Sequence, residues 1–534
     1  MNMTPDPTSA LNQRIAGSSS VIKADSTLSG SGSGPWFAIV AMASVALYRP
    51  MVVWAQNAWD LAAPAELFVF ALALFGAQIL AFITLVAVGV KATGAVTCVA
   101  GTMFLLLHWE SVVFLPAKVW LLLVIGAAVV LHFQSGVRLS RTLAGLSAVI
   151  LVLAPAVQTL AAHVASIEPY PITDLAPRES VTATGSVEDV LVVVVDSYPS
   201  IRLAEAWFGH DSDQLVSTLS GRGLTVETSA WSHNTFTGLA IPGLLELQQI
   251  VDPGPSGNWG NRRSTFDLIR GDNLVATSLQ TAGFEYTHVE SGWDGAHCGT
   301  NPDVCLKAPL FNEMSWKLFE PSIIRRWLLS RYGNISVPGS LQATTHLESL
   351  ESQFGDGERD YVFAHLILPH APIVVDEACQ VRPDVTSGSG LLNPEEAEPE
   401  SIETLSPQLA CVDSLLARIV ALVEDETAVL ITSDHGSGSR RQVLKPSHTW
   451  SDADIAERLG ILLAYKVPET CEQGSTDSSL EAMRMVVSCA VDLRLPDNNG
   501  LFLIGSEDPV AVDPARMDRI QKQVNGGLIE PDAS

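Results

Sequence analysis

The chain has few basic residues for its length. Its 534 residues include 31 Lys and Arg against 58 Asp and Glu, which gives a formal net charge of −27. Nucleic acid recruits an excess of Lys and Arg, because its phosphate backbone is negatively charged. The composition therefore excludes nucleic acid as an expected partner, and the acidic surface instead suits a soluble domain that attracts cations.

Cysteine is also scarce, and no two cysteines have the CxxC spacing that is typical of thiol-bound zinc. Cys98 lies in an apolar segment, and the other six lie downstream: Cys298, Cys305, Cys379, Cys411, Cys471 and Cys489. An even number in an exported domain suits disulfides. Cys298 with Cys305, in "CGTNPDVC", is the favoured local pair, and Cys471 with Cys489 is the next. The sequence alone leaves the connectivity open.

Charged residues are sparse between Trp36 and Ala165, where most of the apolar excess is concentrated. The mean hydropathy of the whole chain is +0.26, which is high for a soluble protein and low for a polytopic transporter. A helix of roughly 20 apolar residues can cross the hydrocarbon core. The sequence predicts about five membrane spans: Trp36–Ala55, Leu67–Val90, Ala92–Leu107, Val119–His132 and Ala144–Ala162.

The charges between the spans predict their direction. The basic residues Lys91, Arg138 and Arg141 lie in the loops of one side, and the acidic residues Asp60, Glu66 and Glu110 lie in the alternate loops. The positive-inside rule then places the N-terminus in the cytoplasm. An odd number of spans puts everything after about residue 165 outside the cell membrane. Arg49 and Pro50 leave a broken or re-entrant first helix as an alternative.

The composition divides the chain into five parts. Residues 1–35, ending in "STLSGSGSGP", are predicted to be a disordered cytoplasmic tail. The transmembrane domain of about five helices (36–165) and a linker (166–186) follow, then an extracytoplasmic domain (187–510) and a C-terminal tail (511–534). Residues 381–407 have the composition of an acidic surface insertion.

The extracytoplasmic part alternates apolar strand patterns with helical patterns. The strand candidates are "VEDVLVVVVD", "FEYTHVES", "DYVFAHLIL", "AVLITSD" and "LGILLAY". The helical stretches between them include "PSIRLAEAWF" and "PQLACVDSLLARIVALVED". Such alternation predicts one doubly wound α/β domain with a central, mostly parallel sheet.

Polar side chains follow several of the predicted strands. Asp196 ends one strand, Asp434 and His435 follow another in "VLITSDHGSG", and His365 and His370 lie in "AHLILPHAP". Ligands bind at the carboxyl edge of an open α/β sheet, and carboxylate and imidazole are ligands of divalent metals. The pattern therefore predicts a metal site. Taken singly, each residue also has a structural interpretation. Asp196 suits a helix cap, and His365 suits a buried core position.

A nucleophile candidate lies in "SHNTFTGLAIPGLLEL", residues 232–247. A hydroxyl at a helix N-terminus beside a cation can lose its proton and attack phosphorus or sulfur. Thr235 and Thr237 both meet this description. Both also suit helix N-caps.

Taken in order, "VVVVDS", "TGLAIP", "HLILPH" and "SDHG" resemble the alkaline phosphatase superfamily. The resemblance covers most of residues 187–470 and is specific to the membrane-anchored sulfatase-like branch, which contains phosphoethanolamine transferases and lipoteichoic acid synthases. It implies an alkaline-phosphatase-like (sulfatase-like) domain after the transmembrane helices.

The resemblance also implies roles for individual residues. It selects Thr237 over Thr235 as the nucleophile, because Thr237 precedes Pro242 by five positions. The implied metal ligands are Asp196, Thr237, Asp434 and His435, and the implied substrate-binding residues are His365, His370 and His448. One divalent ion, zinc or manganese, is the expected cofactor.

The expected function is transfer of a phospho-substituent from a membrane lipid donor to an envelope glycan or lipid through a phospho-Thr intermediate. The alternatives are a sulfatase-like hydrolase of phosphate or sulfate esters and a non-catalytic envelope protein with a decayed site. Formylglycine sulfatases need a CxPxR motif, which no cysteine here begins. Transferases commonly have Glu after "DHG", where this chain has Ser437, so the sequence leaves the substrate open. It also leaves the oligomeric state open.

Overall fold

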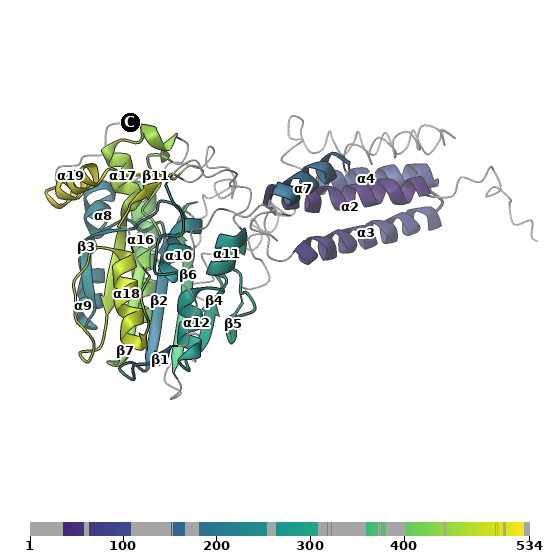
Figure 1. The fold of residues 1–534 in the computed structure, drawn as a ribbon. Helices are drawn as coiled ribbons and strands as arrows, with labels where there is room; N and C mark the ends of the chain where they lie inside the picture. Colours follow the sequence, from purple (N-terminus) through teal and green to yellow (C-terminus); the bar gives the residue numbers. More distant parts are fainter. Residues whose placement is uncertain are drawn as a thin grey trace, which may run out of the picture.

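The computed structural model describes residues 36–57, 64–107, 151, 153–165, 181–253, 263–307, 318, 322, 359–371, 373, 375–380, 402–442, 445–496, 498, 500–505 and 509–527. Figure 1 shows a bundle of N-terminal helices beside an α/β domain. The predicted tail (1–35), the predicted span at 119–132, most of the linker (166–180) and residues 381–401 of the insertion lie outside the described residues.

The N-terminal helices are α2 (Trp36–Asn57), α3 (Pro64–Ala87), α4 (Ala92–Leu107) and α7 (Ala154–Ala165). Helix α2 packs against the other three. Within the described residues, two helices are long and apolar enough to cross a membrane, over Ala38–Ala55 and Leu67–Ala87, and a shorter apolar helix covers Gly94–Phe104. The predicted count of five spans is therefore not confirmed.

One side-chain hydrogen bond joins two helices of this bundle. Pro50 lies inside α2, and the hydroxyl of Thr159 in α7 donates to the carbonyl of Met51 over 3.0 Å. This bond links α7 to α2. Large apolar side chains of α3 and α7 face outward, among them Leu72, Leu80 and Leu160. This surface suits contact with lipid.

The α/β domain is built on a seven-stranded sheet in the order β3-β8-β7-β2-β6-β4-β5. Its strands are β2 (Asp189–Asp196), β3 (Thr225–Trp231), β4 (Glu285–Val289), β5 (Val304–Leu306), β6 (Asp360–Pro369), β7 (Thr427–Ser433) and β8 (Gly460–Lys466). Strands β7, β2, β6, β4 and β5 pair in parallel, and β8 pairs antiparallel with both β7 and β3. The predicted mostly parallel central sheet is confirmed.

Helices cover both faces of this sheet (Figure 1). One face packs α8 (Ile201–Phe208), α9 (Asp213–Gly221), α16 (Ile402–Val420), α17 (Asp452–Leu459) and α19 (Pro514–Asn525). The other packs α10 (Thr237–Leu245), α11 (Arg263–Ile269), α12 (Leu274–Thr281) and α18 (Ser479–Ala490). Successive side chains of a strand point to opposite faces, so Val193 of β2 joins the first core and Val192 joins the second.

Short elements complete the domain: β1 (Thr182–Ala183) pairs with β9 (Val491–Asp492), and β10 (Leu503–Ile504) pairs with β11 (Val510–Ala511). Two single-turn 3₁₀ helices are η5 (Asp294–Ala296) and η8 (Ser447–Thr449). Strand β1 lies within the stretch that the sequence assigned to a linker, so the packed domain begins before residue 187. The structure joins Cys298 to Cys305, Cys379 to Cys411 and Cys471 to Cys489.

The predicted boundary at residue 510 is wrong, because α19 follows it and belongs to the domain. Asp513 caps this helix by accepting a hydrogen bond from the backbone N–H of Arg516. Met517, Ile520 and Val524 are buried in the core at helical spacing. Three apolar residues among many charged ones gave too weak a pattern for the sequence to predict a packed helix.

Asp454 anchors the start of α17. Its carboxylate accepts from the backbone N–H of Ser451 over 2.9 Å, from Arg440 Nε over 2.9 Å and from Lys445 Nζ over 3.2 Å. Burial alone would raise the pKa of Asp454, but these three partners together hold the pKa below its ordinary value of 3.8. The ionised carboxylate therefore stabilises the folded state.

We expect Asp454→Asn to lower the free energy of unfolding by about 1–3 kcal/mol at neutral pH, because three donors lose a charged acceptor. Since the folded pKa is the lower one, this contribution is present above the ordinary value of 3.8 and is lost as the pH falls toward the folded pKa. Denaturant unfolding of both proteins at several pH values measures the difference. A loss that stays constant down to about pH 2 would contradict this assignment.

The control is Asp452→Asn. Asp452 pairs with Arg516 and Arg519, but its side chain is 31% exposed, against 4% for Asp454. Exposed ion pairs contribute about 1 kcal/mol or less, so this variant should unfold at nearly the wild-type denaturant concentration.

Candidate active site

The ends of two neighbouring strands form the base of the site. Asp196 is the last residue of β2, and Asp434 follows the last residue of β7. The two strands pair in parallel, with Val195 opposite Ser433, so the two carboxylates emerge side by side at the carboxyl edge. Both carboxylates are buried, with exposures of 6% and 3%.

Ser197 ties these two strand ends together. Its backbone has a positive φ of 67°, a conformation that costs energy for a residue other than glycine. In this conformation its N–H donates to Asp434 Oδ1 over 3.2 Å, and its hydroxyl donates to Asp196 Oδ1 over 3.1 Å. The bend after β2 therefore positions both carboxylates.

The imidazole of His435 has a defined orientation. Its Nδ1 lies 3.0 Å from the carbonyl oxygen of Gly436, which can only accept, so Nδ1 carries the proton. Its Nε2 lone pair then faces the two carboxylates, 3.3 Å from Asp434 Oδ2 and 3.7 Å from Asp196 Oδ1. A backbone carbonyl that holds one ring nitrogen while the other faces a cation is the usual arrangement of a metal-binding histidine.

Gly436 is required by the backbone around it. A Cβ at this position would lie 2.0 Å from the carbonyl oxygen of Glu457 and 2.4 Å from that of Gly460. The Gly436 N–H also donates to the carbonyl of Arg458 over 2.9 Å. The glycine in "SDHG" therefore lets α17 approach the loop that carries Asp434 and His435.

The three side chains fit a divalent metal. The ligand atoms of Asp196, Asp434 and His435 lie within 4.8 Å of one another. Asp434 Oδ2 is buried and makes no hydrogen bond within the described residues, so a lone pair is left facing the site. Two carboxylates and one imidazole are a donor set that zinc and manganese both accept.

The protonation states follow from burial and from neighbouring charges. Burial opposes ionisation of Asp196, but His370, His365 and His435 outweigh it and hold the pKa of Asp196 well below its usual range. Burial and the Asp196 charge raise the pKa of Asp434 to about 6. Burial, with the charge of Arg458, holds the pKa of His435 well below its ordinary value, so the ring is neutral.

Thr237 lies beside this group at the first position of α10, with Phe236 as the N-cap. Its hydroxyl oxygen is 3.2 Å from His435 Nε2. The nearby Thr235 hydroxyl instead accepts the N–H of Gly505 over 3.0 Å, which fixes a loop. The geometry therefore brings Thr237, and not Thr235, to the three predicted ligands, at a helix end whose dipole favours an incoming anion.

The three predicted substrate-binding histidines occupy different positions. His365 is fully buried, with Nε2 3.6 Å from Asp196 Oδ2, and the edge of Trp293 packs against its ring. His370 is partly exposed, and its ring centre is 6.4 Å from that of His435. His448 lies exposed on η8. Substrate binding by these residues stays a prediction.

The sequence analysis missed Arg458, which lies in the last turn of α17 and is 5% exposed. Its guanidinium donates from Nη2 to His435 Nε2 over 3.0 Å. The available signal was a Glu-Arg pair, Glu457 and Arg458, directly before the apolar run "LGILLAY".

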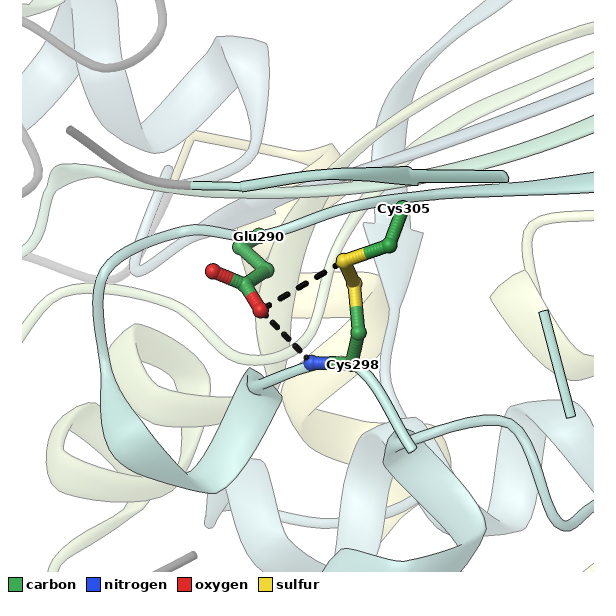
Figure 2. A group of neighbouring side chains, drawn as sticks. All are labelled: Glu290, Cys298 and Cys305. Carbon is green, nitrogen blue, oxygen red and sulfur yellow. Dashed lines mark hydrogen bonds between the residues drawn. A yellow bond between two sulfur atoms is a disulfide. The ribbon is translucent and has the colours of Figure 1, made fainter. Parts of the chain in front are cut away.

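A second group of possible metal ligands comprises Glu290, Cys298 and Cys305. Figure 2 shows the Glu290 carboxylate accepting the Cys298 N–H over 3.0 Å and lying 3.5 Å from Cys305 Sγ. Both sulfurs belong to one disulfide, whereas a metal binds thiolates. This group is therefore a structural contact after β4.

The structure is similar to those of solved phosphoethanolamine transferases and of a hydrolase. Lipooligosaccharide phosphoethanolamine transferase A from Neisseria meningitidis, an integral membrane protein, aligns with 14% identity and a TM-score of 0.37 over 86% of this chain and 95% of that chain. The C-terminal periplasmic domain of EcEptC from Escherichia coli, in complex with Zn, aligns with 12% identity and a TM-score of 0.40 over 64% and 96%.

The phosphonate monoester hydrolase of Agrobacterium radiobacter aligns with 11% identity and a TM-score of 0.38 over 58% of this chain and 75% of that chain. No protein-family model matches the sequence, and no curated protein does.

We expect the full chain to bind one divalent ion at this site and Asp434→Asn to weaken zinc binding by at least about 100-fold, because a ligand charge is lost. Calorimetric titration of the chelator-treated protein with zinc measures the affinity. Asp454→Asn, which also removes a buried carboxylate, is the matched control and should bind zinc as the wild type does. Equal zinc affinity of all three proteins would place the metal elsewhere.

Proposed function

We propose that this chain is a membrane-anchored, metal-dependent transferase. It moves a phospho-substituent, such as phosphoethanolamine or phosphoglycerol, from a lipid donor to an envelope glycan or lipid. The observation that supports this most is the position of Thr237, whose hydroxyl oxygen lies 3.2 Å from His435 Nε2 at the N-terminus of α10. A hydroxyl nucleophile, a metal-ligand set and a helix N-terminus meet at one point.

In the first step, Thr237 Oγ1 forms a bond to phosphorus while the bond from phosphorus to the oxygen of the lipid alcohol breaks. The proton that leaves Thr237 is balanced by the proton that the departing alcohol takes up. Asp196, Asp434 and His435 would hold a divalent ion, which lowers the pKa of the Thr237 hydroxyl and offsets phosphoryl charge when bound. The product is a phospho-Thr enzyme and a free lipid alcohol.

In the second step, an acceptor hydroxyl attacks the same phosphorus and releases Thr237. The N-terminus of α10 favours the negative phosphoryl group through its dipole. In this proposal His370, partly exposed beside His435, orients the transferred group, and His365 supports Asp196 from the buried side. Charge that grows in the transition state is stabilised by preorganised groups of this kind.

The apolar N-terminal helices suit a reaction on lipids. Two of them are long and apolar enough to cross a membrane. An anchored domain meets a lipid donor confined to the same surface, which raises its effective concentration without any new contact. We propose a cytoplasmic N-terminus and an extracytoplasmic catalytic domain.

Thr237→Ala should lower transfer by a factor of at least about 1,000, because it removes the hydroxyl that lies at His435 Nε2 and at the N-terminus of α10. Thr237→Ser, which keeps a hydroxyl, should retain measurable transfer. The assay uses purified full chain with a labelled lipid donor, and mass spectrometry detects the transferred phospho-substituent on Thr237. Thr235→Ala is the matched control, since its hydroxyl serves a loop contact. Wild-type rates in Thr237→Ala would remove the covalent route.

The choice between transfer and hydrolysis depends on the second step. We expect the phospho-Thr enzyme to react with a lipid or sugar alcohol at least about 100-fold faster than with water, because an acceptor held in the site has a high effective concentration. Trapping the intermediate and then adding either alcohol or buffer alone measures both rates. Equal decay in both solutions would make this chain a hydrolase.

A further inference from the structure

Arg458 joins the two segments that build the site. Its Nε donates to the carbonyl of Thr235 over 3.1 Å, and its Nη1 donates to the carbonyl of Gly436 over 2.8 Å. The first carbonyl belongs to the segment that carries the nucleophile, and the second belongs to the segment that carries the metal ligands. Two of the three guanidinium nitrogens are therefore fixed by backbone.

The third nitrogen reaches the ligand set itself. Nη2 of Arg458 donates to His435 Nε2 over 3.0 Å. Because Nδ1 of this ring is bonded to the Gly436 carbonyl, Nε2 offers the ring's one available lone pair. That lone pair is also the one that points at Asp196 and Asp434. A guanidinium N–H and a metal ion cannot both take it.

Charge explains why a buried cation is found here. Asp196 and Asp434 are buried side by side, and two adjacent carboxylates repel each other unless a positive group compensates them. Arg458 supplies one positive charge close to His435, and a divalent ion would supply two at the same place. Arginine stays protonated in proteins, so its charge persists when the metal arrives.

We propose that Arg458 and the divalent ion are alternative partners of His435 Nε2. Without the metal, Arg458 donates to Nε2 and holds the ligand group together. When the metal binds Nε2, the freed Nη2 of Arg458 donates to a phosphoryl oxygen of the substrate. The assignment of that oxygen to a substrate rests on the proposed phosphoryl transfer. The exchange of Arg458 for the metal at His435 Nε2 is independent of that transfer. Nε and Nη1 keep their backbone partners, so the freed group remains next to Thr237.

The test measures zinc affinity of the full chain by calorimetry after chelation. Arg458→Gln removes the competing donor and the repelling charge, so zinc should bind at least about tenfold more tightly than in the wild type. A residue that only braces the two segments would have the opposite effect, because its loss would disorder the ligands. Equal or weaker zinc binding in Arg458→Gln therefore overturns the exchange.

Arg440→Gln is the matched control. Arg440 is also a mostly buried arginine, but it pairs with Asp454 and not with the ligand group. Its loss should leave zinc affinity within about twofold of the wild type. A tightening as large as in Arg458→Gln would show that the effect comes from net charge in general and would overturn the assignment to Arg458.

Arg458→Lys provides a second variant if Arg458→Gln does not fold. It keeps the charge but cannot span three acceptors. Zinc affinity should stay within about threefold of the wild type, while the affinity for inorganic phosphate in the presence of zinc should fall by about tenfold. Unchanged phosphate affinity, or a loss of zinc binding greater than tenfold, contradicts the proposal.

These binding measurements require no turnover, so the two proposals fail separately. Full activity of Thr237→Ala would remove the covalent transfer and leave the competition between Arg458 and zinc intact. Zinc binding that is not tightened in Arg458→Gln would remove the competition and leave the covalent transfer intact.

Discussion

The parallel pairing of β2 with β7 is the constraint on which the site depends. Val195 lies opposite Ser433, so the next residue of each strand, Asp196 and Asp434, reaches the sheet edge at the same level. A slip by one residue would turn one carboxylate into the opposite core, because side chains alternate between faces. The valine-rich interior of β2, buried on both faces, makes such a slip costly.

Around these two carboxylates the structure concentrates groups that are costly to bury. His435 and the strained Ser197 contact them, and the buried Arg458 contacts His435. Each is compensated by a specific partner: a carbonyl for the imidazole, two carbonyls for the guanidinium and two carboxylates for Ser197. Buried charges and strained backbone gather at functional sites, and here they lie beside the Thr237 hydroxyl.

The contacts of Arg458 join the segment that carries Thr237 to the segment that carries the predicted metal ligands. Arg458 donates to a backbone carbonyl of the nucleophile segment, to one of the ligand segment and to His435 Nε2, so one side chain contacts all three. The apolar helices of the N-terminal bundle add the other requirement of the proposed reaction, which is proximity to a lipid donor. Together these features favour a site that is preorganised before the substrate arrives.

By itself, the sequence determined the alternation of strands and helices, the mostly parallel sheet and the strand-end positions of Asp196, Asp434 and His435, because period-2 burial and apolar runs are local patterns. It did not determine the packed helix after residue 510, which has only three apolar residues, or β3, which is half exposed. Only the tertiary structure showed that the Thr237 hydroxyl and Arg458 both lie against His435 Nε2. Thr237 and His435 lie 198 positions apart, and Arg458 reaches His435 across 23 positions from the last turn of α17, so only the folded chain brings these side chains together.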